Sequence, residues 1–260
     1  MFDLRALLSP LALLIAAYLP SCAGYLPAQA PMETRSYPAG AERSRALVVF
    51  LPGLRDRASD FQARGFVQGL HRHHLAVDAI AADAHVNYYT KGTFKQRLQQ
   101  DVIRPARDRG YAEIWLVGIS LGGFGALRYA QTHPGQITGV LALSPYLGEP
   151  EDIRAVLDGA APSPEAKRRA NGGFPTDSLW RWLRDRETGT DSGVRIFLGY
   201  GRDEEFARAC GLMAATLPPG RVLSVAGKHR WSTWKHLWRQ FLEGPPPSWG
   251  AGPPAAAGTS

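Results

Sequence analysis

Cysteine is scarce in this chain, which has two in 260 residues, Cys22 and Cys210. Two cysteines cannot supply the repeated thiolate spacing of a structural zinc site or the disulfide framework of a small secreted domain. We therefore expect no metal site. Cys210 lies in a segment with the pattern of a buried helix face, where a lone thiol behaves as a small apolar side chain. A disulfide between Cys22 and Cys210 is the alternative.

The chain also has no single basic patch in its sequence. Lysine and arginine number 30 against 23 acidic residues, a net charge of +7, but they are scattered rather than interleaved with aromatic residues in one stripe. This scatter argues against nucleic acid as a partner. A positive balance is better suited to attraction by an anionic membrane surface.

No uninterrupted apolar run is long enough to span a membrane. The apolar stretch from Ala6 to Pro20 is broken by Pro10 and followed by small residues, which favours an export signal over a permanent span. The segment Leu19–Cys22 resembles the lipobox of bacterial lipoproteins, which implies lipidation of Cys22, although Pro20 and Asp3 depart from that pattern. We expect residues 1–22 to direct export, and the protein to be periplasmic or otherwise extracytoplasmic and anchored to a membrane.

The rest of the chain divides by composition. Residues 23–45 are rich in Pro, Ala and Gly and predict a tether with a short edge strand near Met32–Tyr37. Residues 46–243 should form the main folded domain, and residues 244–260 a disordered tail. Within the domain, residues 145–193 break the regular rhythm with turn formers and two short helical segments, at Glu151–Leu157 and Asp177–Arg186. A connection of this length predicts a lid or cap over a binding site, or else a packing excursion.

Strands and helices alternate through the domain at residues 46–243. Short β-branched runs predict strands, and the stretches between them predict helices; such alternation indicates an α/β fold with a parallel sheet covered on both faces. The predicted strands are Ala46–Leu51, Leu75–Ile80, Ala112–Gly118, Ile137–Leu143, Val194–Gly199 and Arg221–Val225. The predicted helices are Ser59–His71, Gly92–Arg107, Leu121–His133, Glu204–Leu217 and Trp231–Leu242, with Pro105 kinking or ending the second of these.

The most informative motif is Gly118-Ile-Ser-Leu-Gly-Gly123, which follows an apolar strand and opens directly into a helix. A chain that reverses this sharply holds Ser120 in a strained conformation and requires glycines two positions before and after it. The turn raises the serine hydroxyl above the sheet edge. In this context Ser120 is predicted to be a nucleophile.

A serine nucleophile needs a base and an acid. His229 lies in the loop between the last predicted strand and the last helix, at the edge where active sites of parallel sheets form, whereas His236 falls inside that helix. We therefore predict His229 as the base. The acid should follow the preceding strand, where Asp203 is preferred because Asp is the commoner partner of imidazole, and Glu204 is the alternative from the usual spacing.

The remaining site residues follow from the same edge of the sheet. The backbone N–H groups of Leu121, at a helix start, and Leu54, after a Pro-Gly turn, should form an oxyanion hole. His85 follows the second predicted strand, and we expect it to line the substrate pocket.

Taken together, the serine turn, the Leu51-Pro-Gly53 loop, the acid after a strand and Gly-x-His before a final helix resemble the α/β-hydrolase superfamily over Ala46 to Glu243. The resemblance implies a mostly parallel sheet of about six to eight strands. It also implies cofactor-free acyl chemistry by Ser120, His229 and Asp203 or Glu204. A small-molecule or lipid ester is the expected substrate. Acyl transfer with the same residues, and a non-catalytic surface lipoprotein, are the alternatives.

Overall fold

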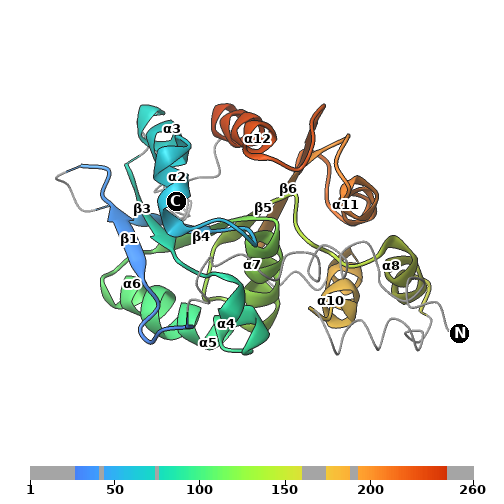
Figure 1. Ribbon diagram of the computed structural model, residues 1–260, viewed down its shortest axis with the longest axis horizontal. Coiled ribbons are helices and arrows are strands. Elements are labelled where there is room, and N and C mark those ends of the chain that lie inside the picture. The colour runs from blue at the N-terminus through green and yellow to red at the C-terminus, as the bar shows by residue number, and fades with distance from the viewer. Residues whose placement is uncertain (1–26, 41–43, 74–75, 160–173, 188–192, 245–260) are drawn as a thin grey trace, which may run out of the picture.

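A computed structural model describes residues 27–40, 44–73, 76–159, 174–187 and 193–244 (Figure 1). The predictions for the export signal, for lipidation of Cys22 and for the C-terminal tail concern residues outside these ranges. Within the described ranges, no helix combines the length and the apolar character that crossing a bilayer requires.

The described residues form a seven-stranded sheet in the order β1-β3-β2-β4-β5-β6-β7. Strand β1 runs antiparallel to β3, and every other neighbouring pair is parallel. The central strands β2, β4 and β5 are apolar and buried because helices cover both faces. The strands are β1 Thr34–Tyr37, β2 Ala46–Leu51, β3 Val77–Ala82, β4 Glu113–Ile119, β5 Gly139–Leu143, β6 Arg195–Gly201 and β7 Val222–Val225. The predicted α/β fold, with its parallel sheet and short edge strand, is confirmed.

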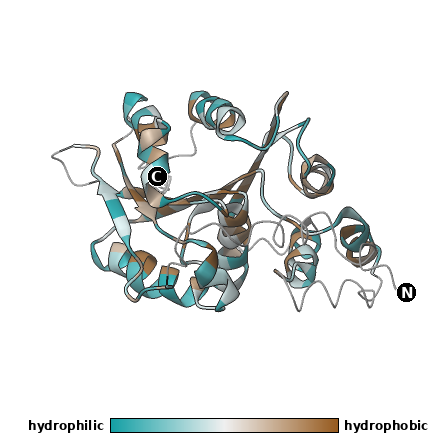
Figure 2. Ribbon diagram, viewed as in Figure 1, coloured by the Kyte–Doolittle hydropathy of each residue, from teal (hydrophilic) through white to brown (hydrophobic). Residues whose placement is uncertain are grey.

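Helices pack on both sides of the sheet, as Figure 1 shows. One side is covered by α2 Ala58–Ala63, α3 Phe66–Arg72 and α12 Trp231–Glu243, whose apolar residues form one core cluster. The other core cluster includes residues from α4 Val86–Thr90, α5 Phe94–Leu98, the π-helix η2 Gln99–Ile103, α6 Arg104–Asp108, α7 Leu121–Thr132, α8 Pro150–Leu157, α10 Asp177–Glu187 and α11 Ala207–Ala214. Figure 2 shows the sheet largely in brown between helices whose outer sides are more hydrophilic.

Two predicted helices differ from those observed in their continuity, and a third, expected at Glu204–Leu217, is shorter and covers only Ala207–Ala214. The helix expected at 59–71 is divided into α2 and α3 because Gly65 adopts a φ of +85° between them. The helix expected at 92–107 continues through a π-helical turn, η2, before α6 begins at Arg104. Pro105 lies at the start of α6 and has no N–H to donate, so the α-helical hydrogen-bond ladder is interrupted there, as expected. Helix α4 was not predicted.

The long connection after Pro145 contributes to the core in the part that the structure describes. The indole N–H of Trp180 on α10 donates to the carbonyl of Leu147 over 2.8 Å, and Trp180 is fully buried. Gln131 on α7 donates to the backbone of Ser178 over 2.6 Å. These contacts hold α10 against α7 and against the segment that follows β5. Residues 160–173 and 188–192 of the predicted lid lie outside the described residues.

Candidate active site

Ser120 occupies the sharp turn between β4 and α7 with a φ of +52° and a ψ of −113°. Strain of this kind costs on the order of 1–3 kcal/mol and persists where surrounding contacts impose it. A Cβ on Gly118 would lie 2.2 Å from the Gly122 carbonyl oxygen, and one on Gly122 would lie 2.2 Å from the Leu51 carbonyl oxygen. The turn therefore closes because both flanking residues lack side chains, as the motif predicts.

The structure brings His229 to Ser120. Its Nε2 lies 3.0 Å from Ser120 Oγ, although the two residues are 109 positions apart. The imidazole projects from the segment between β7 and α12, and the rings of Phe206 and Trp234 flank it edge-on with centroid separations of 4.8 and 5.0 Å. These aromatic neighbours fix the ring plane. His236, by contrast, is exposed on α12 beside Gln240.

The carboxylate that faces His229 belongs to Glu204, and the preference for Asp203 is corrected. Glu204 Oε2 lies 3.4 Å from His229 Nδ1, and the Glu204 side chain is fully buried. This separation is that of an ion pair rather than a short hydrogen bond. Glu204 Oε1 and His229 Nδ1 are both buried without a hydrogen-bond partner within the described structure, so a small rotation that joins the two side chains would satisfy both. Asp203 is exposed and its Oδ2 accepts the backbone N–H of Gly227 over 2.9 Å.

Ser144 is a residue of the site that the sequence analysis missed. It is fully buried just after β5 with a φ of +46°, and its hydroxyl donates to Glu204 Oε2 over 2.7 Å. The indole N–H of Trp234 donates to Ser144 Oγ over 3.0 Å. Ser144 thus holds Glu204 at the same carboxylate oxygen that faces His229. A serine immediately after a predicted central strand was the available signal.

Leu54 and Leu121 both line the pocket in front of Ser120. Leu121 is the first residue of α7, so its N–H belongs to the unpaired first turn. The loop after β2 approaches the nucleophile closely, because a Cβ on Gly53 would lie 3.5 Å from Ser120 Cβ. This placement agrees with the two predicted oxyanion donors, whose role remains a prediction.

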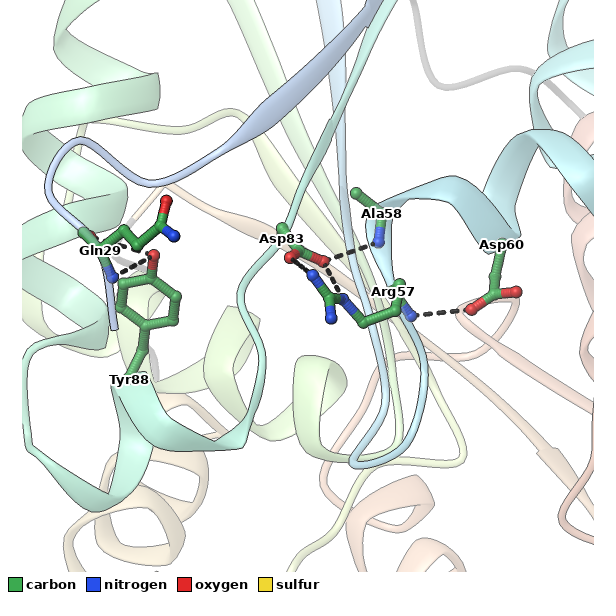
Figure 3. Close-up of polar contacts among 6 residues, drawn as sticks. All are labelled: Gln29, Arg57, Ala58, Asp60, Asp83 and Tyr88. Atoms are coloured by element: carbon green, nitrogen blue, oxygen red, sulfur yellow. Dashed lines mark hydrogen bonds and ion pairs between the residues drawn. The ribbon is translucent and has the colours of Figure 1, made fainter. Parts of the chain in front are cut away.

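An ion pair fixes the far end of that loop (Figure 3). Asp83, at the end of β3, accepts from the Arg57 guanidinium and from the backbone N–H of Ala58, the latter over 3.1 Å. Asp60 accepts the Arg57 N–H over 2.8 Å. Burial alone would raise the pKa of Asp83, but the hydrogen bonds from Arg57 and Ala58 and the Arg57 charge bring it below its usual range.

A pocket of about 390 Å³ opens over Ser120. Aromatic side chains form much of the pocket wall. Asp56 links the loop after β2 to the start of α12, because its Oδ1 accepts the Trp231 indole N–H over 3.0 Å. Burial raises the pKa of Asp56. The lining residues are Leu54, Arg55, Asp56, Ser120, Leu121, Tyr146, Phe174, Glu205, Phe206, His229, Arg230, Trp231 and Trp234.

His85 does not line this pocket, so that prediction is wrong. Its ring packs on Tyr88 with a centroid separation of 4.7 Å, and the residue is buried near Asp83. Residue 85 is the N-cap of α4, a helix that was not predicted. In the described ranges, no three His, Cys, Asp or Glu side chains gather closely enough to hold a metal ion.

Comparisons with known proteins bear on the family and the fold of the chain. The model of the protein family described as "Putative esterase" matches residues 31–242. A solved ferulic acid esterase is 19% identical, with 77% of this chain and 84% of that chain covered and a TM-score of 0.57. Est1E from Butyrivibrio proteoclasticus is 15% identical, with 82% and 94% covered and a TM-score of 0.56. A monoacylglycerol lipase from Paleococcus ferrophilus is 16% identical, with 82% and 97% covered and a TM-score of 0.54.

These structural similarities confirm the α/β-hydrolase fold. A search of curated protein sequences returns no match.

Proposed function

Because the chain belongs to the esterase family that its residues 31–242 match, and is therefore a carboxylic ester hydrolase, we propose that it works through Ser120, His229 and Glu204. The observation that carries this proposal is the 3.0 Å approach of His229 Nε2 to Ser120 Oγ. A neutral imidazole at this distance can accept the hydroxyl proton as the oxygen attacks. No metal or cofactor takes part in the proposed reaction.

In the proposed reaction, Ser120 Oγ adds to the ester carbonyl while His229 takes its proton. The N–H groups of Leu54 and Leu121 stabilise the negative charge that develops on the carbonyl oxygen. Collapse of this intermediate expels the alcohol, which receives the proton from His229, and leaves the acyl group on Ser120. Water, deprotonated by His229, then releases the acid.

Glu204 has a positioning and electrostatic part in this scheme. An imidazolium forms twice in each turnover, and a carboxylate on its Nδ1 side stabilises it and keeps the other nitrogen facing the serine. Glu204 suits this part because it is fully buried, so that water screens its charge weakly. Ser144 supports it by donating to the same oxygen that faces His229.

A fluorophosphonate probe tests the proposal directly. We expect the wild-type chain to be labelled and hydrolyse p-nitrophenyl esters, whereas Ser120→Ala and His229→Ala should do neither at a detectable rate. The matched control is His236→Ala, which removes an exposed imidazole from the next helix and should behave as wild type. Equal labelling of wild type and Ser120→Ala would overturn the assignment. A panel of acyl chain lengths would then define the substrate.

We also propose, from the sequence, that the enzyme is exported and anchored by lipid on Cys22, which lies outside the described residues. Radiolabelled palmitate should be incorporated into the wild-type chain in a bacterial host and not into Cys22→Ser. Cys210→Ser is the matched control and should still be labelled. Release of wild-type protein without label into the soluble fraction would contradict the anchor.

A further inference from the structure

A groove larger than the catalytic pocket, about 840 Å³, runs between α3 and α12. These helices lie side by side on the same side of the sheet (Figure 1). Gly69 allows their close approach, because a Cβ there would lie 3.2 Å from Trp238 Nε1. The Trp238 indole N–H donates to the Phe66 carbonyl over 3.0 Å, and the two rings stack. The floor is therefore rigid.

Cations stand on both rims of this groove. Arg64 follows α2 just before α3, Arg72 ends α3, Lys235 and Arg239 lie on α12, and all four are exposed. Among the lining residues Glu243 is the acidic one, and it pairs loosely with Arg239 at 3.9 Å. Folding thus collects basic residues that are scattered in the sequence. The positive potential of such a cleft favours an anionic ligand.

The shape of the groove distinguishes between anionic ligands. Cations that face each other across a concave floor can contact both sides of a chain, whereas a flat bilayer would reach the rims and leave the floor empty. Trp231 lies half-buried in the same groove with the Arg64 guanidinium 5.7 Å from its ring centroid. An aromatic face next to cations suits stacked sugar rings that carry carboxylates.

The groove also adjoins the catalytic pocket. Trp231 lines both, and Arg55 and Arg230 add two further cations to the pocket wall. We propose that the groove binds an acidic polysaccharide and holds it beside Ser120, so that an ester substituent on the chain enters the pocket. The second half of this proposal rests on the proposed esterase function.

Binding is tested first, with catalysis silenced. Full-length Ser120→Ala protein is titrated with polygalacturonate oligomers, with neutral dextran as the negative control, at two salt concentrations. Adding Arg72→Gln, Lys235→Gln and Arg239→Gln should weaken binding about tenfold or more, because surface ion pairs are individually weak and act here together. The matched control replaces the exposed Arg35, Lys91 and Arg104 by Gln and should leave binding unchanged.

The outcomes separate the two proposals. Binding that depends on the groove cations and weakens with salt supports the site, even if the fluorophosphonate experiment fails. Equal loss in both triple variants, no loss in the groove variant, or preference for phosphatidylglycerol vesicles or single-stranded DNA over polygalacturonate overturns it. The same three groove substitutions are then made in the enzyme that keeps Ser120. They should raise the KM for methyl-esterified polygalacturonate and leave kcat/KM for p-nitrophenyl acetate unchanged. An unchanged KM would refute the placement beside Ser120.

Discussion

Replacing Glu204 by Gln removes the carboxylate charge while keeping nearly the same shape. In the folded protein the Glu204 side chain is fully buried, with Oε2 3.4 Å from His229 Nδ1 and held by Ser144 at 2.7 Å. The glutamine cannot balance an imidazolium, and its amide N–H groups compete with the Nδ1 proton for the same space. Loss of the equivalent charge in a serine protease triad lowers kcat by about 10⁴, or about 5.5 kcal/mol of transition-state stabilisation. We expect a loss of about 10³ to 10⁴ in kcat/KM.

Asp203→Asn is the matched control for this experiment. Its carboxylate accepts the Gly227 N–H at an exposed position, and an asparagine carbonyl can accept the same hydrogen bond. A surface change of this kind should leave kcat/KM within about twofold of wild type. Hydrolysis of p-nitrophenyl acetate at pH 7.5 measures both variants, and circular dichroism checks that each is folded. The reasoning fails if Glu204→Gln keeps more than about a tenth of the activity, or if Asp203→Asn loses as much.

Three further predictions concern stability and reactivity. Gly122→Ala should unfold or inactivate the enzyme, because the added Cβ would lie 2.2 Å from the Leu51 carbonyl oxygen. Gly211→Ala is its control: Gly211 lies on the open side of α11, and the substitution should stabilise the folded protein by about 0.5–1 kcal/mol. Asp83→Asn should lower the Tm at pH 7, and the difference should shrink as pH falls below about 4, because a carboxyl group with a lowered folded-state pKa stabilises the fold while ionised. The Cys210 thiol, whose pKa burial raises, should resist DTNB in folded Cys22→Ser protein and react fully in denaturant.

Each of these has a result that contradicts it. A Gly122→Ala enzyme with normal activity and Tm would show that the turn can open without cost. A Tm difference for Asp83→Asn that grows at low pH would reverse the assigned sign. Rapid reaction of Cys210 with DTNB in the native protein would mean that α11 opens readily.

Local sequence patterns were sufficient to predict those parts of the site whose geometry depends on a single segment of the chain. The serine turn follows from Gly118 and Gly122, whose spacing allows one backbone geometry, and His229 follows from its place before the last helix. These residues carry their own structural context. The parallel sheet was predicted from the alternation of strands and helices, and its six to eight strands from the resemblance to a known superfamily, whereas the order of the strands was not predicted and is given by the structure.

The errors arose where the orientation of a side chain depends on distant contacts. Strand β6 ends at Gly201 rather than at the predicted Gly199. After it, the Asp203 side chain faces outward and accepts the Gly227 N–H, whereas the Glu204 side chain faces inward and accepts the Ser144 hydroxyl. Both residues are carboxylates in one short loop. The usual spacing after this strand pointed to Glu204, but the commoner use of Asp as the partner of imidazole was given more weight. The prediction that His85 lines the pocket was wrong for the same reason. The orientation of its side chain depends on packing against Tyr88, which lies in a helix that was not predicted from the sequence.

The hydrogen bond between Asp56 and Trp231 joins residues that are 175 positions apart. During translation, the loop that contains Asp56 is synthesised early, whereas the helix that contains Trp231 is synthesised near the end of the chain. A nascent chain therefore has its nucleophile long before it has the histidine and the wall that complete the pocket. Hydrolysis should begin after synthesis of α12, so premature termination before that helix yields a product that is inert as well as incomplete.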